Sequence, residues 1–214
     1  MNRLDELRSN LQEVQSRILN PNVTLIVVTK TYPASDVQIL RDLGVENFGE
    51  NRNEEGILKS AEVPARWHYQ GEIQSRKLRD IAGWADVIHS LDSQRHIEKL
   101  SAVAQETIEV FLQLSLDGDP ARGGAVESEL PSLADSVQSL PHLKLAGLMC
   151  VPPLNSDPHI AFSEISHIHR RFIEKYPSAP SLSAGMSGDF EVAIEYGATH
   201  IRVGSSILGS RTGR

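Results

Sequence analysis

Short apolar runs recur along this chain, each followed by a segment with helical spacing, and this alternation restricts the possible folds. The first run, residues 23–29, is mostly aliphatic and β-branched. Such a run is typical of a strand buried on both faces, as in a parallel sheet whose crossovers are helices. Counting that run, the sequence holds eight candidate strands, at residues 23–29, 47–49, 67–69, 86–89, 109–116, 143–149, 180–184 and 200–203.

Eight strands separated by helices predict an α/β fold, a closed (β/α)8 barrel of the TIM type. The clearest helical segments between strands are residues 95–104 and 160–176, and no long helix follows the last strand. An amphipathic helix at residues 4–18, ended by Asn20-Pro21-Asn22, could cover the side left open there. We therefore expect a single-domain barrel over residues 1–214 with an extra N-terminal helix. An open, doubly wound sheet is the alternative.

Charge and cysteine content narrow the classes of function. The chain has 21 basic and 28 acidic residues, a formal net charge of −7, which argues against nucleic-acid binding. Cys150 is the only cysteine, so no intrachain disulfide can form and a reducing compartment is expected. No segment resembles a signal peptide or a membrane span. These features predict a cytoplasmic protein that binds neither nucleic acid nor membrane.

Lys30 is the first residue that could carry chemistry, because it follows the first buried strand. The carboxyl ends of barrel strands form the usual active-site face, so Lys30 is expected at the mouth. Apolar surroundings lower the pKa of a lysine and leave a nucleophilic amine, which can form a Schiff base with an aldehyde. The alternative is an ordinary lysine whose amine reaches solvent at the strand end.

The loops after the last two predicted strands have the composition of a phosphate site. One contains Ser187 and Gly188 ahead of a predicted helix at residues 190–196, and the other contains Gly204 and Ser205. Barrels often bind phosphate with these two loops, through hydroxyls, glycines and free N–H groups. Either loop alone could be an ordinary turn or helix cap. With an amine-bearing strand end, they predict one cavity for a ligand with an aldehyde and a phosphate, such as pyridoxal phosphate.

Arg202, two residues before Gly204, bears on the reaction that such a site could support. A guanidinium can only donate hydrogen bonds, so a pyridine nitrogen facing it must be an unprotonated acceptor. Enzymes that stabilise carbanions strongly place an acid there instead. Arg202 near the cofactor ring therefore predicts weak carbanion chemistry. The alternative is a surface ion pair.

Six segments in order along the chain resemble those of the pyridoxal phosphate homeostasis proteins, which are related to the barrel domain of alanine racemase. The segments are IVVTKTYP around Lys30, NFGENR at 47–52, WHYQGEIQSRK at 67–77, LAGLMCVPP at 145–153, LSAGMSGDFEVAIEYGAT at 182–199 and IRVGSSILGSR at 201–211. Together they span nearly the whole chain, which makes the resemblance far more specific than any one motif.

The resemblance implies a (β/α)8 barrel that holds pyridoxal 5′-phosphate as an internal aldimine and acts in storage, buffering or delivery without substantial catalysis. It implies that the partners are the cofactor and possible client apoenzymes that use it. We expect a monomer. Tyr32 stands where the family usually has a second lysine. The cofactor-binding residues expected from the loops and the resemblance are Lys30, Asn51, Met149, Ser187, Gly188, Arg202, Gly204 and Ser205.

Two other activities are compatible with parts of the sequence. An amino-acid racemase needs a second base opposite Lys30, and Tyr32 or Tyr69 could supply it. A hydrolase could use Ser187 in a partial nucleophile elbow with His68 or His89, although the motif lacks its last glycine. No metal site is expected, since His167 and His169 are two residues apart and point to different helix faces.

Overall fold

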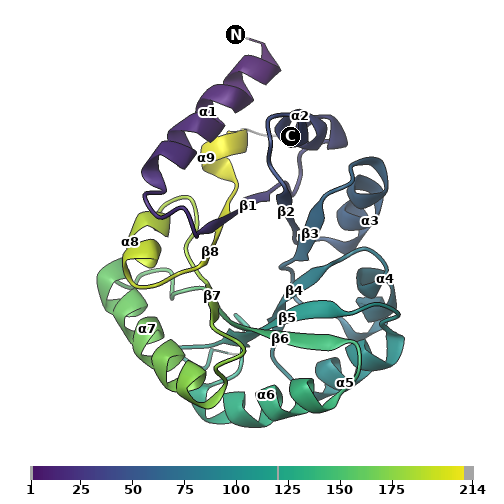
Figure 1. Ribbon diagram of the computed structural model, residues 1–214, viewed down its shortest axis with the longest axis vertical. Coiled ribbons are helices and arrows are strands. Elements are labelled where there is room, and N and C mark those ends of the chain that lie inside the picture. The colour runs from purple at the N-terminus through teal and green to yellow at the C-terminus, as the bar shows by residue number, and fades with distance from the viewer. Residues whose placement is uncertain (1, 120, 210–214) are drawn as a thin grey trace.

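Parallel strands close into a barrel in the computed structural model, which describes residues 2–119 and 121–209 (Figure 1). Strand β8 pairs with β1 from Thr24 opposite His200 to Val27 opposite Val203. This closure confirms the predicted (β/α)8 barrel and shows that the open-sheet alternative is wrong. The eight strands among the described residues are β1 Thr24–Val28, β2 Asn47–Glu50, β3 Arg66–Tyr69, β4 Val87–Leu91, β5 Ile108–Leu114, β6 Leu143–Cys150, β7 Ser181–Ser183 and β8 His200–Val203.

Helices surround the barrel and bury its outer face (Figure 1). The helices in the described part of the chain are α1 Arg3–Arg17, α2 Ala34–Asp42, α3 Asn53–Glu62, α4 Leu78–Ala82, α5 Gln94–Val103, α6 Leu130–Ser139, α7 Pro158–Lys175, α8 Phe190–Glu195 and α9 Ser205–Leu208, with short 3-10 turns at Ser75–Lys77 and Glu127–Glu129. The four helices with predicted ranges, α1, α5, α7 and α8, begin and end within two residues of the prediction.

Three strands are shorter than predicted. Strand β1 lacks one residue at each end of the predicted run 23–29, and the shortening of β5 and β7 has identifiable reasons. The fifth strand ends at Leu114 instead of residue 116, because Ala125 folds back onto it. Ala125 donates its N–H to the carbonyl of Gln113, and its carbonyl accepts from the N–H of Ser115. The seventh strand ends at Ser183 because the chain turns at Gly185, whose φ of +92° favours glycine.

Helix α1 is the extra N-terminal helix expected from the sequence. The Asn2 side chain caps its first turn by accepting from the N–H of Asp5. Arg3 and Asn10 donate to the carbonyls of Leu208 and Ile207, at 3.1 and 2.9 Å, so α1 lies against the short helix α9 (Figure 1). The helix therefore covers the side of the barrel next to α9. The last two residues of the final motif, Ser210 and Arg211, lie outside the described residues.

A directed chain of hydrogen bonds crosses the barrel interior. His68 Nε2 lies 3.0 Å from Asn47 Oδ1, His68 Nδ1 lies 2.8 Å from His89 Nε2, and His89 Nδ1 lies 2.9 Å from Ser183 Oγ. Arg202 Nη1 donates to the same Ser183 oxygen at 2.6 Å. Because Arg202 can only donate and the Asn47 oxygen can only accept, every bond runs in one direction, from Arg202 to Asn47. Each histidine is therefore a neutral Nε2–H tautomer.

Burial keeps the interior histidines uncharged. Desolvation lowers the pKa of both His68 and His89 well below the ordinary value of 6.5, and it lowers the pKa of His200 to about 4. His89 also stacks on Phe111, with ring centroids 4.4 Å apart. Protonating His89 or His200 in place would add a charge that the Arg202 cation repels.

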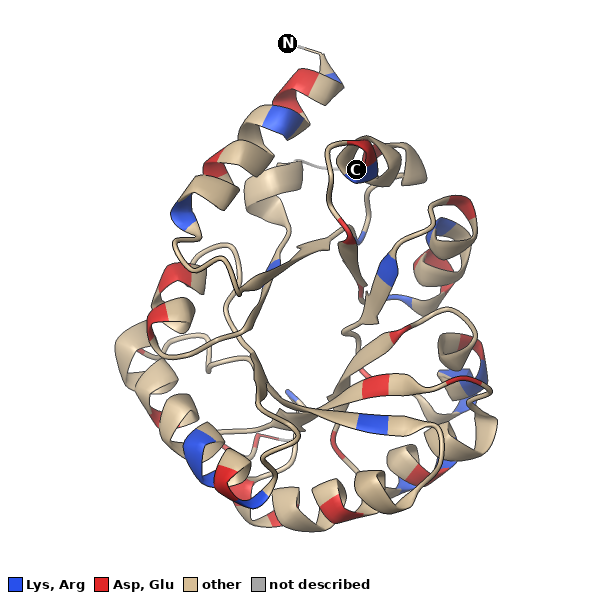
Figure 2. Cartoon of the chain, viewed as in Figure 1, with Lys and Arg blue, Asp and Glu red and all other residues tan. Residues whose placement is uncertain are grey.

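The outer surface carries charges of both signs. Figure 2 shows acidic and basic residues interspersed over the surrounding helices, consistent with the formal net charge of −7. Among residues 2–119 and 121–209, no helix combines the length and apolar character that a bilayer crossing requires.

We expect acid to destabilise the fold through His68, His89 and His200. Their pKa values are lower in the folded than in the unfolded chain, so unfolding takes up protons and the stability present above pH 6.5 is lost below it. Each such histidine contributes a slope of about 1.4 kcal/mol per pH unit below pH 6. Urea unfolding at pH 7, 6 and 5 measures this slope.

The variant His89→Gln should lose about 1.4 kcal/mol per pH unit of that slope. The matched control, His167→Gln, changes an exposed histidine on α7 and should leave the slope unchanged. An equal slope in both variants would contradict the account.

Candidate functional site

A cavity of about 530 Å³ opens at the carboxyl ends of the barrel strands. It is bounded by the ends of β1, β2 and β6, by β8, and by the loops that follow β7 and β8. All eight residues expected at a ligand site line it, although their roles in binding stay a prediction. These residues are Lys30, Asn51, Met149, Ser187, Gly188, Arg202, Gly204 and Ser205.

Lys30 lies in the turn between β1 and α2. Its side chain is half-buried and lines the cavity, which is the placement that the strand-end argument predicts. The next residue, Thr31, has φ of +72°. That left-handed conformation costs a non-glycine residue about 1–2 kcal/mol, so the surrounding structure must hold the turn in place.

Arg202 is a buried cation at the inner wall of the cavity. Only 5% of the residue is exposed, and its guanidinium donates to Ser183 Oγ and, at 3.1 Å, to the carbonyl of Cys150. Burial lowers its pKa to about 10, so it stays charged at neutral pH. The surface ion pair considered from the sequence is therefore wrong: among the described residues, no carboxylate forms a salt bridge with Arg202.

Cys150 lies at the end of β6 with no exposed surface. Desolvation raises the pKa of its thiol to about 12, so the reactive thiolate is scarce at neutral pH. Full burial also protects this thiol from oxidants that reach the barrel mouth.

The loops after β7 and β8 meet at the other end of the cavity. Ser187 Oγ accepts long hydrogen bonds from the N–H groups of Gly204 and Ser206, at 3.3 and 3.4 Å. A side chain at Gly188 would meet no atom within 4 Å, so its backbone is open to a ligand. Ser205 begins α9 and is exposed. Hydroxyls and backbone N–H groups at this end suit the oxygens of a phosphate.

The structure adds lining residues that sequence reasoning missed. Gln70 follows β3 directly and lines the cavity, although the sequence analysis assigned it no role. Its Nε2 and the Oδ1 of Asn51 are buried without a hydrogen-bond partner. Tyr32 also lines the cavity, and its hydroxyl donates to the carbonyl of Gly209 at 2.8 Å. Functional residues of barrels follow the strand ends. Applied to the predicted strand at residues 67–69, this rule would have found Gln70.

The hydrolase interpretation is wrong, because the serine and the histidines do not meet. His68 and His89 belong to the interior chain, where the serine partner is Ser183, while the Ser187 hydroxyl faces the backbone of the β8 loop. In the part of the chain that the structure describes, no group of three His, Cys, Asp or Glu side chains could hold a metal ion.

The tyrosines considered as a second racemase base are also engaged elsewhere. The Tyr69 hydroxyl donates to the carbonyl of Glu72 at 2.8 Å, and Tyr69 is absent from the described cavity lining. Burial raises the pKa of Tyr69 to about 12, which makes it a poor base at neutral pH. Tyr32 follows the same strand end as Lys30.

The cavity is electropositive. Lys30 and Arg202 are the charged side chains among the described residues that line it, and none of those residues is Asp or Glu. Two basic side chains, with no acidic residue among the described lining residues, favour an anionic ligand. The amine, the uncharged amides and the phosphate-type loops together suit a planar aldehyde that carries a phosphate.

Comparison with known proteins agrees with this geometry. Residues 3–212 match the family model "Alanine racemase, N-terminal domain". The chain is 43% identical over 201 residues to the pyridoxal phosphate homeostasis protein of Corynebacterium glutamicum, covering 89% of this chain and 91% of that protein. PipY of Synechococcus elongatus PCC7942, solved with PLP bound, has a TM-score of 0.87 at 31% identity, covering 95% of this chain and all of that one.

A more distant structure shares the fold alone. The alanine racemase of Corynebacterium glutamicum has a TM-score of 0.79 at 15% identity, and this chain covers 62% of it. The barrel and its mouth thus define a protein of the alanine racemase N-terminal domain class. Within that class, the chain belongs to the family of pyridoxal phosphate homeostasis proteins.

Proposed function

We propose that this chain binds pyridoxal 5′-phosphate through an imine bond to Lys30 and keeps the cofactor in reserve for other proteins. The observation that carries the proposal is the single cavity in which Lys30 and Arg202 face hydroxyl-bearing and glycine-bearing loops with no lining carboxylate among the described residues. Relatives named as pyridoxal phosphate homeostasis proteins, and PipY solved with PLP, support it.

Different residues of the cavity bind different groups of the cofactor. Pyridoxal phosphate supplies an aldehyde that condenses with a primary amine and releases water, and a second amine can displace the first without oxidation or reduction. Lys30 supplies the resident amine at the β1 end. Ser187, Gly188, Gly204 and Ser205 supply hydroxyls and backbone N–H groups for the phosphate. Asn51 and Met149 lie on the wall between these two ends.

Two features support a role without substantial catalysis. Arg202 can only donate, so a pyridine nitrogen that faces it stays unprotonated and withdraws electrons weakly. Neither tyrosine considered as a second base is poised for that role, since Tyr69 lies away from the described lining and Tyr32 donates to the Gly209 carbonyl. Racemisation needs both a strong electron sink and two bases, so reversible exchange of the bound cofactor is the better supported role.

The proposed function also includes the domain organisation, oligomeric state, location and partners of the chain. We propose that residues 1–214 act as one barrel domain, as a monomer in the cytoplasm, and that client apoenzymes receive the cofactor when their own lysine displaces Lys30. Neither nucleic acid nor membrane is expected as a partner, because the chain carries a net charge of −7 and no helix in its described part could cross a bilayer.

Removing the Lys30 amine tests the imine bond. Lys30→Ala should lose the visible absorbance that wild-type protein shows after incubation with pyridoxal phosphate and gel filtration, because no amine remains in the cavity to condense with the aldehyde. The control Lys99→Ala changes an exposed lysine on α5 and should keep the wild-type spectrum. Full absorbance in Lys30→Ala would place the imine elsewhere.

Negative charge in the two loops tests the phosphate end. The double variant Ser187→Glu/Ser205→Glu places carboxylates where the phosphate is proposed to bind, so like charges should repel. Cofactor retention after dialysis should fall at least about tenfold, which corresponds to 1.4 kcal/mol. Ser139→Glu, an exposed change on α6, is the control. Retention equal to that of the control would show that the phosphate lies elsewhere.

A further inference from the structure

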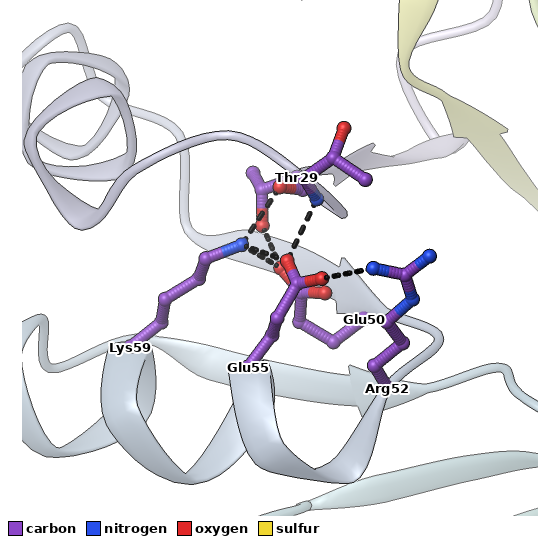
Figure 3. A network of polar contacts seen from close by, with 6 residues as sticks. Thr29, Glu50, Arg52, Glu55 and Lys59 are labelled. Atoms are coloured by element: carbon purple, nitrogen blue, oxygen red, sulfur yellow. Dashed lines mark hydrogen bonds and ion pairs between the residues drawn. The ribbon is translucent and has the colours of Figure 1, made fainter. Parts of the chain in front are cut away.

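A cluster of buried and half-buried charged side chains forms hydrogen bonds to the turn that carries Lys30. Lys59 on α3 donates to three oxygens: Glu50 Oε1 at 2.6 Å, Glu55 Oε2 at 2.9 Å and the carbonyl of Thr29 at 2.8 Å. Figure 3 shows the Lys59 amine pointing to all three. An ammonium group has three N–H donors, so the cluster uses each of them. We call Glu50, Glu55 and Lys59 the turn-holding cluster.

The cluster forms hydrogen bonds to the residues on both sides of Lys30, Thr29 and Thr31. Before it, the Thr29 carbonyl accepts from Lys59, and the Thr29 hydroxyl donates to Glu50 Oε1 at 2.5 Å. After it, the N–H of Thr31 donates to Glu55 Oε2 at 2.7 Å. Thr31 is the residue with φ of +72°, a conformation that a threonine does not adopt without support. The hydrogen bond that the Thr31 N–H donates to Glu55 therefore supports the strained point of the turn.

Stability alone is a weak reason for this arrangement. Lys59 is 4% exposed and Glu50 is fully buried, so both charges have lost their hydration. Desolvation raises the pKa of Glu50 even though Lys59 lies beside it. Buried ion pairs often add no more stability than apolar side chains of the same volume. What the Lys59–Glu50 ion pair does provide is a fixed backbone geometry for the residues around Lys30.

We propose that Glu50, Glu55 and Lys59 are positioning residues that fix the turn at residues 29–31 and so present the Lys30 amine to the ligand. The three residues are absent from the described cavity lining, so they act through the backbone and not by contact with the ligand. This inference rests on the proposed function, in which Lys30 bonds to the cofactor. It predicts that the cluster matters for ligands that react with the amine and not for ligands that only occupy the cavity.

Two ligands distinguish reaction with the Lys30 amine from simple occupation of the cavity in the full-length protein. Pyridoxal 5′-phosphate has the aldehyde, whereas pyridoxine 5′-phosphate has the same ring and phosphate with a hydroxymethyl group that cannot condense with an amine. Glu55→Ala should weaken binding of pyridoxal phosphate about tenfold and change that of pyridoxine phosphate less than about twofold. Glu55→Gln keeps an oxygen that can accept from Thr31 and should recover part of the loss.

The neighbouring residue of the same helix supplies the control. Glu54 is exposed and pairs with Lys77, away from the Lys30 turn. Glu54→Ala should bind both ligands as wild type does. Since Lys59 alone cannot be removed without leaving Glu50 unpaired, the second variant is Glu50→Gln/Lys59→Met, which removes both buried charges together. It should show the same selective loss.

Amide hydrogen exchange gives a readout without any ligand. Exchange at Thr31 should become faster in Glu55→Ala and stay unchanged in Glu54→Ala. Equal weakening of both ligands, or wild-type binding with wild-type Thr31 exchange, would overturn the positioning role. A wild-type protein without an imine absorbance would instead overturn the proposed function, and Thr31 exchange would still decide whether the cluster holds the turn.

Discussion

Closure of the sheet between β1 and β8 is the constraint on which the site depends. Lys30 and the loop at residues 204–206 are far apart in sequence, yet they follow two strands that pair side by side. All strands are parallel, so their carboxyl ends share one edge, and the β7 loop joins them there. An open sheet would leave β1 and β8 unpaired with each other, and the amine would not share a cavity with the proposed phosphate loops.

Charge is distributed so that the cavity is positive while the core beneath it is neutral. The interior histidines stay uncharged, and their hydrogen bonds all run in the direction away from Arg202. No carboxylate among the described residues forms a salt bridge with this guanidinium at the inner wall. On the outer side of β2, the charges of Lys59, Glu50 and Glu55 are paired and kept out of the described lining. The described lining therefore offers a ligand two basic side chains, Lys30 at the end of β1 and Arg202 at the inner wall.

Much of this could be predicted from sequence, because buried strands leave apolar runs and strand ends mark the functional face. That logic predicted that Lys30 and the loop containing Ser187 share one mouth, and both line the cavity. It missed features that depend on side-chain packing between elements. Thr31 is β-branched, so its left-handed turn has no sequence signal. The partners of Lys59 depend on the rotation of α3 against β2, which apolar spacing does not fix within one residue.

The central claim is that a particular amine in this cavity bonds to a phosphorylated aldehyde. The direct measurement is borohydride reduction of the protein loaded with one equivalent of pyridoxal phosphate, followed by proteolysis and mass spectrometry of the peptides. The account predicts one phosphopyridoxyl group per chain, on the peptide that contains Lys30. Label spread over several surface lysines, or concentrated on another single lysine, would contradict it.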